Sequence, residues 1–137
     1  MLADRALDLS SDPTREEVLV LAHGPGDDGE NDRWLAHMDR RADAIRRAAP
    51  FARVQVATLR EDWPEKRAPA EAAVRAFVTS AGAAGHTAIV VPFRVSGFGS
   101  YAEVLDGLDY VADGRGLLPH PAVTRWVDRQ ARALQGP

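Results

Sequence analysis

The sequence predicts an α/β fold in which helices cover both faces of a mostly parallel sheet of about four strands. Three observations support this prediction. Short apolar runs alternate with longer stretches of helical periodicity. The strongest run is continuously apolar and β-branched, as in a parallel strand buried on both faces. Each run ends in a turn rich in glycine, proline or polar residues. This alternation is typical of a doubly wound, three-layer arrangement.

The length of 137 residues suits one compact domain, and 45% apolar residues are enough to bury a core. Residues 1–16 are expected to be a peripheral N-terminal extension or linker. A possible helical turn near the start is broken by Ser10-Ser11-Asp12-Pro13. The single α/β domain is then expected to cover residues 17–137.

The first half of the domain contains two expected strands and two expected helices. The first strand covers about 17–22, and an amphipathic helix at about 32–49 ends at Pro50. Alternation predicts a second strand at about 52–58, followed by a helix at about 65–82.

The second half begins with the strongest strand, at about 87–93, where Pro92 should occupy the last position because it cannot donate to a ladder. A helix should begin near Tyr101. Leu117-Leu118 is a candidate for a short fourth strand, and helical spacing predicts a closing helix at about 121–134.

Composition excludes several classes of function. A net charge of −3 argues against nucleic-acid binding, and the absence of cysteine excludes disulfides, thiolate metal sites and cysteine nucleophiles. No apolar run approaches the roughly 18 residues of a membrane span. The N-terminus lacks the apolar core of a secretory signal, so we expect a cytoplasmic protein without a membrane partner.

His23 is the principal candidate functional residue. It follows the first expected strand and precedes Gly24-Pro25-Gly26, which must turn. His23 should therefore lie at the carboxyl end of a central strand, the edge where open α/β sheets bind ligands. Imidazole can hold a metal or move a proton near neutral pH. The alternative is a histidine that only caps the turn.

Polar residues follow the other expected strands as well, at the same edge of the sheet. The second turn contributes Arg60-Glu61-Asp62, and the third contributes Arg94, Ser96 and Ser100, with Glu103 slightly further on. Two histidines and a carboxylate suit a divalent metal, so we expect His23 and His120 as metal ligands and Glu103 as a catalytic partner of His23. A surface turn histidine is the alternative for His120, and a solvated helix position is the alternative for Glu103.

The third turn is a candidate for substrate binding. Backbone N–H groups in its glycine-rich loop can bind an anion, arginines can pair with ligand carboxylates, and aromatic rings can form a wall for a flat ring system. The expected substrate-binding residues are Arg60, Arg94, Ser96, Gly97, Phe98, Gly99, Ser100 and Tyr101. For the nearby Trp63, loop-anchoring packing is the preferred interpretation. Two further histidines are expected outside the site: His37 on an exposed helix face and His86 at the opposite edge of the sheet.

At Val18-Leu19-Val20-Leu21-Ala22-His23-Gly24 the chain resembles the sirohydrochlorin cobaltochelatase and ferrochelatase family, the class II chelatases. The likeness continues at Ile89-Val90-Val91-Pro92-Phe93 and at Gly116-Leu117-Leu118-Pro119-His120-Pro121. It covers roughly residues 17–130.

The resemblance implies a doubly wound domain that inserts cobalt or ferrous iron into a tetrapyrrole, with the metal ion as substrate and no organic cofactor. It implies that His23 binds the metal or accepts the pyrrole N–H protons. It also implies pairing of two such domains, as a homodimer or with a second chelatase-like domain.

The chain departs from the family pattern at one important position. The family usually has a second histidine shortly after the third strand, and residues 94–101 contain none. Glu103, His120 or a partner domain would then supply the missing group. Otherwise the domain binds a tetrapyrrole or a metal without catalysing insertion. A phosphorylated metabolite bound at residues 96–100 is a third possibility.

Overall fold

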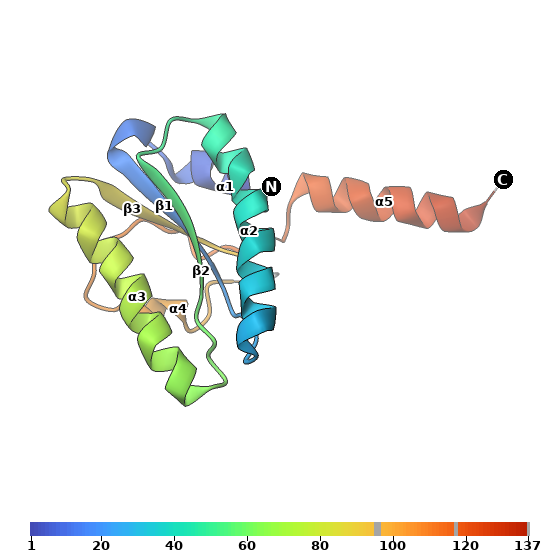
Figure 1. Cartoon of the computed structure of the whole chain (residues 1–137). Coiled ribbons are helices and arrows are strands. Elements are labelled where there is room, and N and C mark those ends of the chain that lie inside the picture. The colour runs from blue at the N-terminus through green and yellow to red at the C-terminus, as the bar shows by residue number, and fades with distance from the viewer. Residues whose placement is uncertain (95–96, 117, 137) are drawn as a thin grey trace.

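The computed structural model describes residues 1–94, 97–116 and 118–136. These residues form a mixed α/β structure in which helices flank a parallel sheet of three strands, in the order β2–β1–β3 (Figure 1). The predicted α/β class is confirmed. The expectation of about four strands is wrong for the described residues.

The central strand is β1 (Glu16–Ala22), and every one of its residues is buried. It pairs in parallel with β2 (Arg53–Thr58) and with β3 (Thr87–Pro92), so that Leu21 lies between Ala57 and Pro92. Pro92 is the last residue of β3, as predicted from its missing N–H group. All three strands therefore point their carboxyl ends toward the same edge.

The alternation of side chains along β1 builds two separate cores. Leu19 and Leu21 face α3 (Pro64–Ala83) and the short α4 (Tyr101–Val104). Val18, Val20 and Ala22 face α2 (Asp28–Ala48) on the other side. Because successive side chains of a strand point to opposite faces, a continuous apolar run such as Val18–Ala22 is what two helical layers require.

The helix predicted at 32–49 begins four residues earlier than expected. Asp27 is its N-cap, and its carboxylate accepts a hydrogen bond from the Glu30 N–H at 2.8 Å. The helix predicted at 65–82 corresponds to α3, which begins with Pro64 in its first turn and continues through Pro69.

The N-terminal segment packs on the sheet, which corrects the expectation of a peripheral extension. Leu2 and Ala6 of α1 (Leu2–Leu9) are buried in the same cluster as α2. The segment then passes through one 3₁₀ turn, η1 (Pro13–Arg15), into β1.

The expected fourth strand at Leu117-Leu118 is not seen among the described residues. Leu118 belongs to no strand, and Leu117 lies outside the described residues. A single parallel bridge joins Val111 to Ile89 instead, with hydrogen bonds of 2.9 and 2.8 Å on either side. The closing helix α5 (Pro121–Gln135) projects away from the domain (Figure 1). Among the described residues, no helix has the length and apolar character needed to span a bilayer.

The first testable prediction concerns Glu16, which joins the N-terminal segment to β1. Its buried carboxylate accepts hydrogen bonds from the side chains of Ser10 and Ser11 and from the N–H groups of Ser11 and Asp12. Burial alone would raise the pKa of Glu16, but these hydrogen bonds outweigh it and hold the pKa below its ordinary value. Glu16→Gln should lower the free energy of unfolding at pH 7 by about 1–3 kcal/mol.

A lowered pKa in the folded state stabilises the protein above the unfolded-state pKa, and this stabilisation disappears as the pH falls through the folded-state pKa. The difference between wild type and Glu16→Gln should therefore be constant near neutrality and shrink below about pH 4.5. Urea unfolding at several pH values measures it, with exposed Asp8→Asn as the control. A difference that does not depend on pH would contradict the assignment.

Candidate functional site

The carboxyl ends of the three strands bring together residues that are far apart in the sequence. His23 follows β1, Glu61 and Asp62 follow β2, and Ser100 lies in the turn after β3. Backbone hydrogen bonds join the first two turns, since the Arg60 N–H donates to the His23 carbonyl at 2.6 Å. This edge of the sheet is where the sequence predicted a site.

His23 lies between two carboxylates on an open surface. Its Nε2 is 3.0 Å from Asp62 Oδ2, and its Nδ1 is 3.5 Å from Glu61 Oε1. The side chain is 43% exposed, so the ring does not point into the core. Trp63 lies beside it with ring centroids 6.4 Å apart. The imidazole is thus positioned by charged partners and remains accessible to a ligand.

Glu61 connects His23 to the third turn. Its second carboxylate oxygen accepts a hydrogen bond from Ser100 Oγ at 2.7 Å. Ser100, Glu61, His23 and Asp62 therefore form one continuous chain of polar contacts, which we call the His23 cluster. An exposed imidazole can accept a proton and pass it on, and the two carboxylates hold this ring in position.

Sequence reasoning placed Glu61 and Asp62 at this edge but did not include them among the site residues. The sequence signal for these two residues was their position, because they follow the end of β2 just as His23 follows the end of β1. No spacing motif links 23 to 61, because the two turns meet only when the strands pair.

The turn after His23 is fixed by close packing against β2. Gly24 has a φ of +77°, and a Cβ atom at this position would lie 2.5 Å from the Cβ of Thr58. Thr58 is buried and donates a hydrogen bond to Asn31 Oδ1 at 2.7 Å. Only glycine fits between the turn and this pair, so the direction of the chain at His23 is set by the fold.

The side chain of Arg60 binds other groups of the protein. Its guanidinium donates to the carbonyls of Pro25 and Gly26 at 3.0 and 2.6 Å and to Asp28 Oδ1 at 2.6 Å. The hydrogen bonds from Arg60 and Lys66 hold the pKa of Asp28 below its ordinary value. The structure therefore shows Arg60 bracing the turn after His23, whereas the sequence predicted that it binds substrate.

Arg94 packs with Phe98 and Tyr101, which follow it in the chain. Arg94 donates to the Phe98 carbonyl at 3.2 Å, and its guanidinium lies 5.2 Å from the ring centre of Tyr101. Phe98 is buried, edge-on to Tyr101 and stacked on Tyr110. Gly97 and Gly99 both have positive φ, and Ser96 lies outside the described residues. Among the described loop residues predicted to bind substrate, Ser100 belongs to the His23 cluster through its hydrogen bond to Glu61.

Tyr101 is fully buried, and its hydroxyl has no hydrogen-bond partner among the residues that the structure describes. Burial raises the pKa of the Tyr101 phenol above its ordinary value, the Glu61 carboxylate raises it further, and Arg94 opposes the change. The phenol therefore stays protonated at neutral pH, next to the His23 cluster.

The other predicted ligands do not join His23. His120 caps α5, since its Nδ1 accepts from the Ala122 N–H at 3.0 Å and its Nε2 lies 2.8 Å from Asp4 Oδ2. Glu103 is exposed on α4. Within residues 1–94, 97–116 and 118–136, no three histidine, aspartate or glutamate side chains are arranged to hold a metal ion. His86 contacts Glu17 at 2.8 Å at the opposite edge, as predicted, and His37 is exposed.

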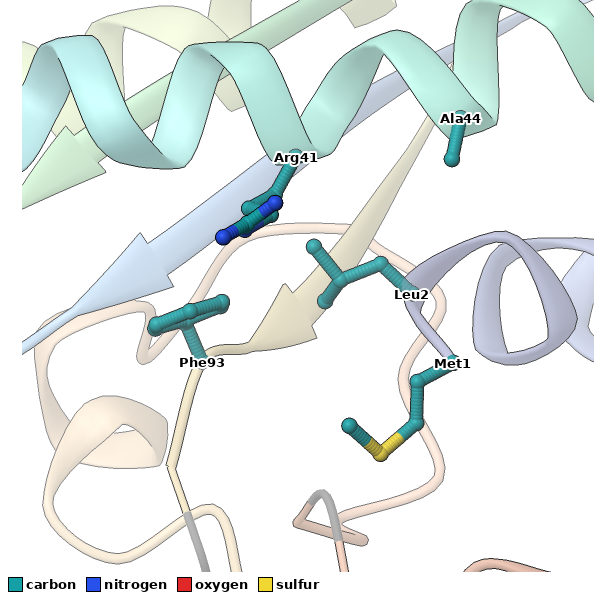
Figure 2. A pocket seen from close by; sticks show the side chains of 5 residues that line it. All are labelled: Met1, Leu2, Arg41, Ala44 and Phe93. Atoms are coloured by element: carbon teal, nitrogen blue, oxygen red, sulfur yellow. The ribbon is translucent and has the colours of Figure 1, made fainter. Parts of the chain in front are cut away.

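Apolar hollows lie elsewhere on the surface. Two adjoining cavities are found between α1, α2 and Phe93, and Figure 2 shows the side chains that line one of them. Neither is lined by His23. The His23 cluster is therefore an open site at the sheet edge.

Comparisons with protein families, with curated proteins and with solved structures found no match to this chain.

The geometry at Gly24 gives the second prediction. Gly24→Ala should destabilise the protein by about 2–4 kcal/mol, because an L-residue at positive φ is strained and the new methyl group collides with Thr58. Chemical denaturation measures the effect. The same substitution at Gly82, which is exposed in α3 with no atom near its would-be Cβ, should be neutral or stabilising. Equal effects at the two positions would contradict the close contact.

The third prediction concerns the Tyr101 hydroxyl. Tyr101→Phe removes a buried donor that lacks a partner in the described structure, so the free energy of unfolding should rise or stay within about 0.5 kcal/mol of wild type. Thermal and urea unfolding measure the change. A loss of more than about 1 kcal/mol would show that the hydroxyl has a partner in the folded protein.

Proposed function

We propose that this protein inserts a divalent metal ion, cobalt or ferrous iron, into a sirohydrochlorin-type tetrapyrrole in cobalamin or sirohaem biosynthesis, in the cytoplasm. The observation that carries the proposal is His23, accessible at the carboxyl end of the central strand and held between two carboxylates. The sequence resemblance at residues 17–24 and 89–93 supports it. The finer description of the fold, a doubly wound chelatase-like domain, belongs to the same proposal.

The chemistry requires a proton acceptor at the sheet edge. When a divalent ion enters a tetrapyrrole, two pyrrole N–H bonds break, two protons leave and metal–nitrogen bonds form. His23 accepts a proton on a ring nitrogen, and the neighbouring carboxylates of Glu61 and Asp62 hold the ring in position. The exposed side of the His23 ring can then pass the proton to solvent.

His23 also has a path to the metal substrate. Asp62 is 69% exposed, whereas Glu61 is held by Ser100. The Asp62 carboxylate is thus the partner that can swing away and leave Nε2 free, while Glu61 keeps the ring in place. A neutral imidazole nitrogen is a good ligand for cobalt and iron.

A second candidate function is a non-catalytic domain that binds a tetrapyrrole or a metal, or that pairs with another chelatase-like domain. One observation favours it. The segment where the family has its second histidine carries Ser100 in this chain, and Ser100 hydrogen-bonds to Glu61. The His23 cluster then lacks a second imidazole within the described residues, so a macrocycle could be held without rapid insertion.

The fourth prediction separates these functions. Wild-type protein should insert cobalt or ferrous iron into sirohydrochlorin faster than the uncatalysed reaction, and His23→Ala should lower the rate by at least about 100-fold, as expected for a general base. Glu61→Gln should lower it less, because the imidazole stays but loses one charged partner. The change in absorption on metal insertion measures the rate.

His37→Ala is the matched control, since His37 is an exposed histidine on α2 that contacts Arg40 and lies outside the His23 cluster, and it should leave the rate unchanged. If wild type and His23→Ala react at the same rate, the enzymatic proposal is wrong. Tight binding of sirohydrochlorin without insertion would then support the non-catalytic domain, and absence of binding would contradict both metal insertion and tetrapyrrole binding.

A further inference from the structure

An apolar groove runs along α2, away from the His23 cluster. Two adjoining cavities of about 250 Å³ each are both lined by Arg41 and Phe93, so they form one continuous hollow, which we call the α2 groove. The other side chains that line it are Met1, Leu2, Trp34, His37, Met38 and Ala44. Leu2 and Met38 are buried and form its floor, whereas Trp34 is 40% exposed. A ligand placed here would cover apolar surface that is now open to water.

The shape of the α2 groove suits a slim ligand. The part between Trp34 and Arg41 follows seven residues of α2, which is about 10 Å of helix. Its sides are apolar, with Trp34 at one end and Phe93 across from the helix. Each cavity is smaller than the roughly 300–1,000 Å³ of a pocket for a drug-sized molecule. An alkyl chain therefore fits this part of the groove better than a macrocycle does.

Arg41 supplies a positive charge at the middle of the groove. Figure 2 shows its side chain extending from α2 toward Phe93, with Leu2 beside them. No aspartate or glutamate of the described residues lines either cavity. An apolar hollow with one fixed cation in it is complementary to a ligand that has an apolar body and one negative charge.

The Arg41 guanidinium has no partner in the part of the chain that the structure describes. Further along the same helix, Arg46 forms ion pairs with Asp39 and Asp43. Arg41 forms neither an ion pair nor a hydrogen bond to any residue of 1–94, 97–116 and 118–136. The sequence of α2 explains the difference, because the positions three and four residues away from Arg41 carry no acidic side chain: they are His37, Met38, Ala44 and Ile45. Its N–H groups are thus available to an external anion.

We propose that the α2 groove is a binding site for a medium-chain fatty acid. The carboxylate accepts hydrogen bonds from the Arg41 guanidinium, which matches the geometry of a carboxylate with two parallel N–H groups. The alkyl chain lies along α2 toward Trp34, between Met38 and Phe93. The inference is independent of the proposed function, because this groove does not include the His23 cluster.

The fifth prediction uses octanoate as the probe and the full chain labelled with ¹⁵N. Octanoate should bind with a Kd of about 1 mM or tighter, as a ligand of about ten non-hydrogen atoms allows. The largest changes in amide chemical shift should be around Trp34, Arg41 and Phe93. Butanoate should bind at least about tenfold more weakly than octanoate, because four methylene groups no longer cover the groove.

The role of Arg41 is tested with a charged and a neutral ligand of equal chain length. Arg41→Gln should raise the Kd of octanoate by at least about tenfold, because a charge-assisted hydrogen bond is lost. The same variant should leave the Kd of 1-octanol within about twofold of wild type. Arg47→Gln is the matched control: Arg47 is an exposed arginine of the same helix that lines neither cavity, so octanoate should bind this variant as it binds wild type.

The apolar end of the site is tested separately. Trp34→Ala should raise the Kd of octanoate and of 1-octanol alike, by at least about tenfold. Trp126→Ala removes another exposed tryptophan, which lies on α5, and should change neither Kd. Circular dichroism and urea unfolding verify that each variant is folded.

Four outcomes would overturn the proposal. The first is the absence of shift changes at saturating octanoate, and the second is a set of changes centred on His23. The third is an equal effect of Arg41→Gln and Arg47→Gln on octanoate, or an equal effect of Arg41→Gln on octanoate and 1-octanol. The fourth is a ligand-free protein whose shifts at Trp34 and Phe93 depend on protein concentration and which excludes octanoate. That result would assign the groove to a second copy of the chain.

Discussion

The structure depends on how the central strand ends. β1 is buried on both faces and paired on both edges, so its apolar residues have no alternative position. It ends at Ala22, and the positive φ of Gly24 and its close contact with Thr58 set the direction of the chain that follows. His23 is the residue between the buried strand and this turn. Its position at the open edge of the sheet therefore follows from core packing, and the remaining residues of the site are arranged around it.

What surrounds His23 decides its chemistry. Glu61 is fixed by Ser100, and Asp62 is largely exposed, so one carboxylate positions the ring and the other can move. The arginines near the site are occupied by backbone carbonyls of the protein, Arg60 by the first turn and Arg94 by the third. Under the proposed function, the cluster would transfer protons and bind the metal ion in passing, and a ligand would be recognised mainly through His23 and its two carboxylates.

Much of the fold could be predicted from the sequence, because apolar periodicity and proline positions reflect local physics. The three strands, the long helices and the terminal position of Pro92 were predicted in this way. The contacts that link distant turns could not be predicted. Nothing in the spacing from His23 to Glu61 or Ser100 signals their contact, and nothing near His120 signals that Asp4 lies beside it. The position of the extra pairing on β3 could not be predicted for a similar reason. The bridge at Val111 depends on contact with the edge of β3.

The proposed function requires that ligands bind at the His23 cluster. The most direct test is to titrate metal-free sirohydrochlorin into ¹⁵N-labelled protein and to map the changes in backbone amide chemical shifts. The account predicts the largest changes around His23 and Gly24, around Glu61 and Asp62, and at Ser100, where the three turns meet. Shifts centred on Trp34 and Phe93 in the α2 groove, or no shifts at saturating ligand, would contradict it.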